Sequence, residues 1–174
     1  MSLEEQSVRT SAYPGGVNQF RRDGSLRHFL TLEGVPLPII EGLLDRAQSF
    51  VRTLGKQRPA FSQALHGVTV ANLFTEPSTR TRVSFELAAK RLGADVVNLE
   101  VQLSSRVKGE SMLDTVCTLE SLHVDVLVIR ESEAGVLSLV ANNVAPHVSV
   151  LSAGESHVSH PTQGLLDALT VRQY

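Results

Sequence analysis

The sequence predicts an α/β fold, with a mostly parallel four-stranded sheet and helices on both faces. Short apolar segments that suit buried strands alternate four times with amphipathic helical segments, from about residue 68 onward. The chain has 174 residues, which is enough for one hydrophobic core. It is 42% hydrophobic and 20% charged, as is ordinary for a globular domain.

Four apolar segments are predicted to be strands. The third, Val126-Leu127-Val128-Ile129, is apolar throughout, as expected of a strand that is covered on both faces. A helical segment follows each strand, so the crossovers are expected to be right-handed and the strands parallel. The predicted strands are 68–74, 96–99, 126–129 and 148–151.

The predicted helices have recognisable start signals. Ser78 is expected to be the N-cap of the helix after the first strand. Ser111 and Asp114 have the spacing of a capping box, and Pro161 suits the first position of the last helix. One further amphipathic helix is expected before the first strand, over 37–51.

The chain is expected to divide into three parts. Residues 1–25 are predicted to be a poorly ordered polar extension, because they contain Pro14-Gly15-Gly16 and other turn signals. Residues 26–160 form the predicted domain. Residues 161–174 begin a further helix, and the sequence stops within it at Tyr174.

Composition argues against several classes of protein. The net charge of −2 does not favour binding to nucleic acid or to a membrane surface. The first residues lack the regions of a signal peptide, and no apolar run approaches the ~20 residues of a membrane span. One cysteine, Cys117, excludes an intrachain disulfide and fits a reducing compartment. We therefore expect a soluble, cytoplasmic protein.

Polar side chains follow each predicted strand, and the carboxyl ends of parallel strands are where ligands bind in such sheets. Together they provide hydroxyl groups, cations, a histidine and an amide, which suit an anionic ligand that contains a carbonyl group. They are Ser78, Thr79, Arg80, Thr81 and Arg82 after the first strand, Ser104, Ser105, Arg106 and Lys108 after the second, Arg130 after the third, and His157, Ser159, His160 and Gln163 after the fourth.

The cluster after the first strand is the strongest candidate for an anion site. With Ser78 as N-cap, Thr79, Arg80 and Thr81 occupy the first helical turn, where free backbone N–H groups and the helix dipole favour a phosphate. The alternative is a capped helix with solvated arginines, in which Arg82 pairs with a glutamate four residues on. The Gly-rich spacing of a Walker loop is absent.

Two other candidates also have structural alternatives. Arg130 could pair with Glu131 or Glu133 rather than with a ligand. His160 could be a capping or core histidine. His157 and His160 form an H-x-x-H pair, but no further ligands complete a zinc site, so no metal is expected.

Two motifs resemble the signatures of a known family. The segment Phe74-x-Glu76-x-Ser78-Thr79-Arg80-Thr81-Arg82-x-Ser84-Phe85-Glu86 is similar to the carbamoyl-phosphate signature of the aspartate and ornithine carbamoyltransferases. His160-Pro161-Thr162-Gln163, followed by Leu165-Leu166-Asp167, resembles their second signature. The resemblance runs from about Leu26 to the end of the chain. Lys108-Gly109-Glu110-Ser111 resembles the aspartate branch more than the ornithine branch.

The resemblance implies a role for each matching residue. Ser78, Thr79, Arg80 and Thr81 would bind the phosphate of carbamoyl phosphate, and Arg80 would neutralise the departing phosphate. Thr81, Arg130 and His160 would stabilise the oxyanion, and Gln163 would contact the carbamoyl amino group. The catalytic residues implied in this way are Arg80, Thr81, Arg130 and His160.

The family's assembly is also implied, commonly as a homotrimer and in some members within a larger assembly. Ser104 and Lys108 would reach the active site of a neighbouring subunit; the register leaves Ser105 open, and Val107 stands where some relatives have a second lysine. The substrates would be carbamoyl phosphate and L-aspartate, with no cofactor.

The family's second domain, which binds the amino acid, is not expected in this sequence. We therefore expect the chain to be a fragment or truncated product that binds carbamoyl phosphate weakly and is inactive alone. The alternatives are ornithine carbamoylation and a non-catalytic module that binds carbamoyl phosphate or serves assembly.

Overall fold

A parallel sheet forms the centre of the protein. The computed structural model describes residues 16, 19–53, 63–100 and 111–174. Within them the strand order is β2-β1-β3-β4, and every pair of neighbours is parallel. The strands are β1 (Thr69–Phe74), β2 (Asp95–Glu100), β3 (Val126–Glu131) and β4 (Ser149–Glu155). All four predicted strands are confirmed, and β4 extends four residues beyond its predicted end.

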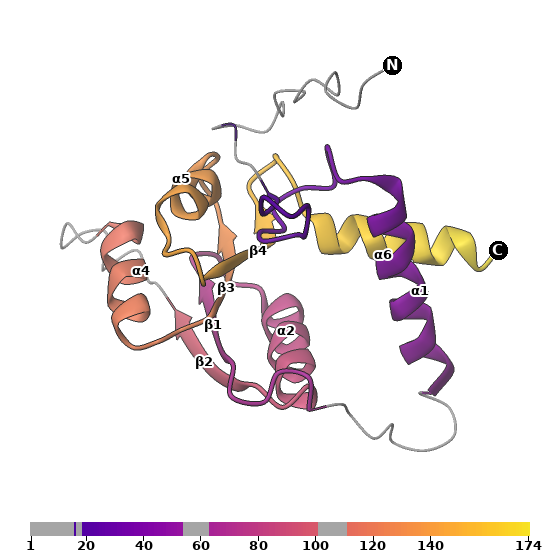
Figure 1. The fold of residues 1–174 in the computed structure, drawn as a ribbon, viewed down its shortest axis with the longest axis horizontal. Coiled ribbons are helices and arrows are strands. Elements are labelled where there is room, and N and C mark those ends of the chain that lie inside the picture. Colours follow the sequence, from indigo (N-terminus) through magenta and orange to yellow (C-terminus); the bar gives the residue numbers. More distant parts are fainter. Residues whose placement is uncertain (1–15, 17–18, 54–62, 101–110) are drawn as a thin grey trace.

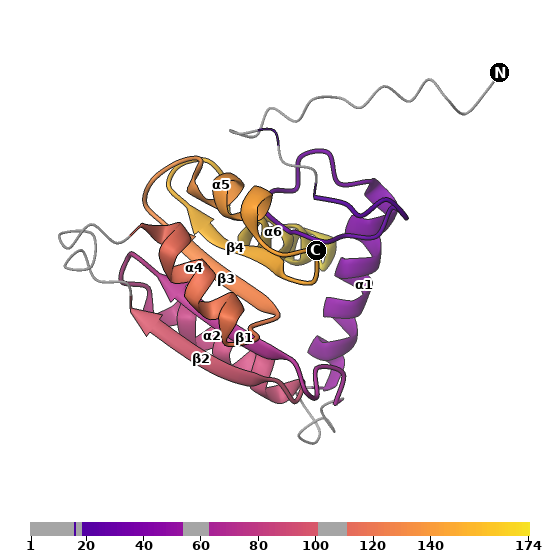
Figure 2. The same ribbon diagram turned by 60° about the vertical axis from the view of Figure 1, so that its left-hand side comes forward.

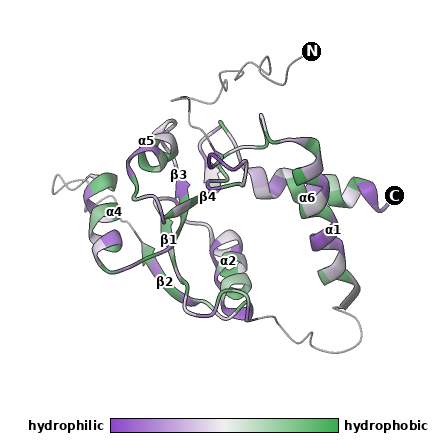
Figure 3. Cartoon of the chain, viewed as in Figure 1, coloured by the Kyte–Doolittle hydropathy of each residue, from purple (hydrophilic) through white to green (hydrophobic). Residues whose placement is uncertain are grey.

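Helices cover both faces of this sheet, which confirms the predicted fold class (Figures 1 and 2). Hydrophilic and hydrophobic residues alternate along α1, α2 and α4, as expected of helices with one apolar side (Figure 3). None of the described helices is long and apolar enough to cross a membrane. The helices are α1 (Leu37–Thr53), α2 (Thr79–Arg91), α4 (Met112–Ser121), α5 (Val136–Asn143) and α6 (Pro161–Arg172).

Alternate residues of the strands form two separate cores, because successive side chains of a strand point to opposite faces. On one face, Val70 and Phe74 of β1 pack with Ala89 of α2. On the other, Ala71 and Leu73 of β1 pack with residues of α4 and α5. The two faces therefore fix α2 on one side of the sheet and α4 with α5 on the other (Figure 1).

The strand order places a crevice at the carboxyl ends of β1 and β3. These strands are neighbours, with Phe74 of β1 opposite Arg130 of β3. The chain leaves β1 toward β2 on one side and leaves β3 toward β4 on the other. At such a reversal the following helices lie on opposite faces, and the space between their starts is where ligands bind in open α/β sheets.

Two of the predicted helix starts are confirmed in full. Ser111 and Asp114 form the capping box: the Asp114 N–H donates to the Ser111 hydroxyl at 3.2 Å, and the Ser111 N–H donates to the Asp114 carboxylate at 2.9 Å. Pro161 begins α6 as predicted.

The prediction that residues 1–25 are poorly ordered is wrong for the part from Gln19 to Ser25. The Gln19 side chain is buried, and its Oε1 accepts from the N–H groups of Leu30 at 2.6 Å and Thr31 at 3.1 Å. Its Nε2 donates to the Thr31 carbonyl at 3.2 Å. A single buried amide thus satisfies the backbone of a segment 11 to 12 residues away, which composition could not reveal.

Phe29, next to the two residues that Gln19 binds, pairs with the outer edge of β4. The Phe29 N–H donates to the Val150 carbonyl at 2.8 Å, and the Phe29 carbonyl accepts from Ser152 N–H at 2.9 Å. Pairing of this kind protects an edge strand that would otherwise expose unpaired backbone groups.

We expect Gln19→Ala to destabilise the fold by about 2–3 kcal/mol, because buried backbone groups of Leu30 and Thr31 lose their partners. Urea unfolding followed by circular dichroism measures the change. Gln48→Ala, at a half-exposed position of α1 where the side chain accepts one surface hydrogen bond from Gln173, is the control and should change stability little. Equal stability of the two variants would contradict the role of Gln19.

His28 is a buried histidine beside the same edge strand. It is 1% exposed, and its Nδ1 accepts from the Val150 N–H at 3.1 Å. Burial, followed by the positive charges of Arg27 and Arg21, lowers the pKa of His28 to about 4. The neutral imidazole is therefore the form that fits the fold.

Stability is expected to decrease by about 3 kcal/mol as the pH falls from 6.5 to 4, because His28 binds a proton near pH 6.5 when unfolded but only near pH 4 when folded. His28→Asn keeps an acceptor for Val150 but cannot be protonated, so it should remove this loss. Urea unfolding at a series of pH values measures it. His147→Asn, at an exposed position, is the control. If both variants lose stability with falling pH as the wild type does, His28 is not the cause of that loss.

Candidate functional site

A cleft of about 780 Å³ opens beside the carboxyl end of β3, between α1, α2 and α6. Its polar residues come from the start of α2, the end of β3 and the start of α6. Its apolar residues come from α1, α2 and α6. Its polar lining is Ser78, Arg80, Thr81, Ser84, Arg130, His160, Thr162 and Gln163, and its apolar lining is Leu43, Leu44, Ala47, Phe85, Ala88, Leu165, Leu166 and Leu169.

The start of α2 presents free hydrogen-bond donors to this cleft. Ser78 is the N-cap, as predicted, and its carbonyl accepts from the Arg82 N–H at 3.0 Å. Its side chain makes no capping hydrogen bond, although serine at this position usually does. Neither the hydroxyl nor the first amides of the helix are used in capping, so both remain able to bind an anion.

Arg80 adds a positive charge at the same helix start. Its side chain is exposed, and no hydrogen bond or ion pair joins its guanidinium to another described residue. Its backbone carbonyl accepts from the Ser84 hydroxyl at 2.7 Å, a contact within α2 that leaves the side chain unconstrained. A guanidinium in this state can bind a phosphate in a bidentate manner without first breaking another contact.

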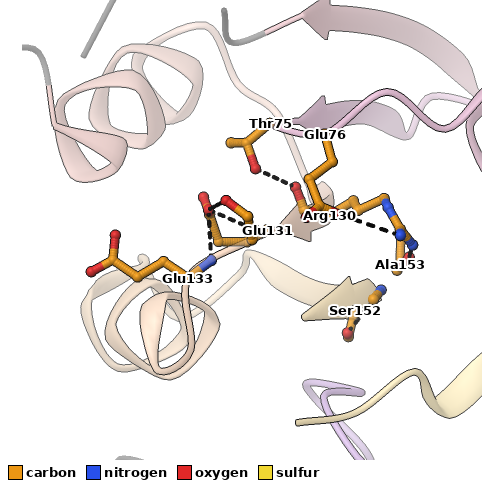
Figure 4. A network of polar contacts seen from close by, with 9 residues as sticks. Thr75, Glu76, Arg130, Glu131, Glu133, Ser152 and Ala153 are labelled. Atoms are coloured by element: carbon orange, nitrogen blue, oxygen red, sulfur yellow. Dashed lines mark hydrogen bonds and ion pairs between the residues drawn. The ribbon is translucent and has the colours of Figure 1, made fainter. Parts of the chain in front are cut away.

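Arg130 lies at the end of β3 and is held from two sides (Figure 4). Its Nη2 lies 3.3 Å from the Glu76 carboxylate, and its Nη1 donates to the Ala153 carbonyl at 3.1 Å. Its Nε is buried without a partner among the described residues. Its backbone carbonyl accepts from the Thr75 N–H at 3.0 Å, which ties the ends of β1 and β3 together.

His160 is the N-cap of α6 and lines the cleft near Arg130. Its Nδ1 lies 3.3 Å from the Thr162 hydroxyl. Burial, and then the positive charge of Arg130, lower the pKa of His160 below its ordinary value. The imidazole is therefore neutral at neutral pH.

Gln163 follows on the first turn of α6. Its Nε2 donates to the Asp167 carboxylate at 2.9 Å. A carboxylate only accepts hydrogen bonds, so this contact fixes which end of the amide faces Asp167. Among the described residues none donates to the Gln163 carbonyl oxygen, which leaves it available as an acceptor in the cleft.

The structure brings most of the predicted site residues to one place. Ser78, Arg80, Thr81, Arg130, His160 and Gln163 all line the cleft. Thr79 is the first residue of α2 but does not line it. Ser104, Ser105, Arg106 and Lys108 lie outside the described residues.

The structure also bears on the alternative roles considered for Arg130, Arg82 and His157. Arg130 pairs with Glu76, not with its neighbours Glu131 or Glu133 as the structural alternative supposed. Glu86, the proposed partner of Arg82, forms an ion pair with Lys90; the hydrogen bond from Lys90 is the main cause that lowers the Glu86 pKa, and the charge of Arg82 also lowers it. His157 is exposed and its Nδ1 lies 3.1 Å from the Ser156 hydroxyl. The described residues contain no cluster of three or more potential metal ligands.

Sequence reasoning missed the parts played by Glu76 and Thr162. Both stand inside the quoted motifs but received no role. Glu76 contacts Arg130, which is 54 residues away in the sequence, so nothing local signalled the pair. Thr162 is two residues from His160, and that spacing at a helix start was the one available signal.

Comparison with known proteins identifies a family. A model of this family, described as aspartate/ornithine carbamoyltransferase, carbamoyl-P binding domain, matches residues 27–173. The chain is similar to the catalytic subunit of M. jannaschii aspartate transcarbamoylase, with 35% identity and a TM-score of 0.72. That match covers 85% of this chain and 47% of the other.

Trypanosoma cruzi aspartate transcarbamoylase gives similar matches. Its complex with carbamoyl phosphate and aspartate has 37% identity and a TM-score of 0.72, covering 84% of this chain and 45% of that one. Its complex with carbamoyl phosphate has 34% identity and a TM-score of 0.70, covering 94% and 46%. The chain spans about half the length of the structures it matches.

We expect His160 to titrate below pH 6.5 in the free protein and its pKa to rise when a dianion occupies the cleft. Burial and Arg130 oppose its protonation, whereas a nearby negative charge favours it. NMR titration of the imidazole signals, without and with saturating inorganic phosphate, measures both values. Exposed His157 is the internal control. An unchanged His160 pKa with phosphate bound would place the anion elsewhere.

Proposed function

The chain belongs to the aspartate/ornithine carbamoyltransferase family, and we propose that it supplies the carbamoyl phosphate half of an aspartate carbamoyltransferase active site. The reaction proposed is transfer of the carbamoyl group to the amine of L-aspartate. The products are N-carbamoyl-L-aspartate and phosphate, a step of pyrimidine biosynthesis. The observation that carries this proposal is the convergence of the α2 start, Arg130 and His160 on one cleft.

The phosphate would bind at the start of α2. The hydroxyl groups of Ser78 and Thr81 and the first amides of the helix would donate to its oxygens. Arg80, whose guanidinium is uncommitted among the described residues, would neutralise the charge that develops on the leaving phosphate. Thr79 would act through its backbone amide or after a small rotation, since it does not line the cleft.

The carbonyl oxygen of the substrate would face Thr81, Arg130 and His160. The amine attacks the carbonyl carbon, and the negative charge moves to this oxygen. Preorganised donors at that position stabilise the tetrahedral intermediate. The bond to phosphate then breaks, and the amine proton is finally carried by the released phosphate. The bonds and protons of this reaction balance without a metal or a covalent nucleophile.

A neutral His160 suits this role. If the Thr162 hydroxyl donates to Nδ1, the ring proton is on Nε2 and can be donated to the carbonyl oxygen. Gln163 would accept from the carbamoyl amino group, since its amide nitrogen is occupied by Asp167. The two side chains would thus distinguish the oxygen end of the carbamoyl group from its nitrogen end.

The support for aspartate over ornithine is narrower. The matched structures from M. jannaschii and T. cruzi are named aspartate transcarbamoylases, and the segment Lys108–Ser111 resembles the aspartate branch. A polypeptide that also carries the second half of these relatives, assayed with each amino acid, tests this choice. Turnover of ornithine alone would overturn it, and no turnover of either would favour a non-catalytic binding module.

The proposed assembly is a homotrimer in which Ser104 and Lys108 of one subunit complete the site of the next. The proposed compartment is the cytoplasm. Analytical ultracentrifugation gives the subunit number. In the longer polypeptide that also carries the second half, mixing Lys108→Ala with Arg80→Ala subunits tests shared sites, because the hybrids should regain activity only if the sites are shared.

Arg80→Ala is expected to weaken carbamoyl phosphate binding by roughly 10- to 100-fold, because one charge-assisted bidentate contact is lost. Isothermal titration calorimetry on the 174-residue chain measures this. Arg22→Ala removes the same charge at an exposed position outside the cleft and is the control. Equal affinities of the wild type and Arg80→Ala would sink the phosphate assignment.

A further inference from the structure

Arg130 can reach its observed position only because the residue beneath it has no side chain. A Cβ placed on Gly154 would lie 2.6 Å from Arg130 Nη1 and 3.2 Å from His160 Cδ2. The first distance is far below a van der Waals contact, and the atom concerned is the one that donates to Ala153. Arg130 and His160, two of the proposed oxyanion donors, therefore both border the space that a side chain on Gly154 would occupy.

The backbone at this point is irregular. Ile129 of β3 is opposite Ser152 of β4, but Glu131 is opposite Glu155. Two steps along β3 thus correspond to three along β4, so β4 contains one extra residue opposite Arg130. Such bulges are uncommon between parallel strands, and they often redirect a side chain near an active site.

A buried serine holds the irregular segment in place. Ser152 is 0% exposed, and its hydroxyl accepts from the Gly154 N–H at 3.2 Å. Gly154 has φ +115°, a conformation that residues with a side chain rarely adopt. Figure 4 shows Ala153 beside the Arg130 guanidinium, with the preceding residue Ser152 farther from it.

We propose that the bulge Ser152–Ala153–Gly154 of β4 is a positioning device for Arg130 and His160. Ala153 accepts from the guanidinium, Gly154 leaves the space it occupies, and Ser152 fixes the backbone of Gly154. None of the three needs to touch the substrate. This inference rests on the proposed function and names the residues that set the geometry of its oxyanion donors.

Gly154→Ala tests the device directly. The added methyl group must displace the Arg130 guanidinium, so carbamoyl phosphate binding should weaken by about tenfold or more in calorimetry, as for loss of a charge-assisted hydrogen bond. Gly67→Ala is the matched control: Gly67 has φ +78° but open space at its Cβ. It likewise places a side chain at positive φ and should bind within about twofold of the wild type.

A double-mutant cycle separates positioning from general damage. If Gly154 acts mainly through Arg130, at 2.6 Å, and less through His160, at 3.2 Å, then adding Gly154→Ala to Arg130→Ala should weaken binding by clearly less than Gly154→Ala does alone. A further loss equal to that of Gly154→Ala alone would overturn the proposal, because it would show an effect that does not pass through Arg130.

If Gly154→Ala fails to fold, Ser152→Ala tests the proposal instead, because this substitution adds no atoms. It should weaken binding several-fold, whereas Ser138→Ala, at an equally buried serine on α5, should not. Wild-type affinity of Ser152→Ala would overturn the proposal. If the wild-type chain itself does not bind carbamoyl phosphate, the proposed function fails instead, and the two failures are distinct.

Discussion

The site depends on holding a guanidinium at the end of a buried strand without neutralising it completely. Arg130 meets this requirement through one partly exposed carboxylate, Glu76 at 3.3 Å, and one backbone carbonyl, Ala153 at 3.1 Å. A fully buried ion pair would cost desolvation and leave little positive potential for a ligand. Because only part of the guanidinium is committed, Arg130 is fixed in direction and still carries charge toward the cleft.

The strand order explains why these contacts are possible. Arg130 is opposite Phe74 of β1 and next to β4, so its side chain can reach the segment that follows β1 and the backbone of β4. His160 begins the helix after β4 and therefore arrives at the same edge. Four stretches that are far apart in the sequence meet at the crevice because all the strands are parallel and end there.

Sequence patterns predicted the elements well because each depends on local physics. The capping box at Ser111 and the proline at the start of α6 need only residues within one helical turn. Most of the candidate site residues lie together because residues that follow parallel strands share one edge of the sheet. A motif resemblance then attached roles to them that no local pattern could supply.

What the sequence could not predict depends on contacts between distant residues. Ser78 was expected at the N-cap and is there, but only the three-dimensional surroundings decide that its hydroxyl does not cap the helix. Glu76 pairs with Arg130 across 54 residues, and Gln19 binds the backbone of residues 30 and 31. Nothing in the sequence distinguished Gly154 from the other glycines among the 12. Its role becomes visible only from the position of the Arg130 side chain in the structure.

The two arginines of the cleft should contribute to anion binding in different ways. Arg80 is exposed, so water and salt screen its charge strongly, and its contribution should follow ionic strength. The Arg130 side chain is only 25% exposed and is already oriented, so its interaction is screened less and loses less conformational entropy. Arg80 therefore suits capture and release of a phosphate. Arg130 suits a contact that must be accurate while the carbonyl oxygen gains charge, which is why its position depends on a bulge in β4.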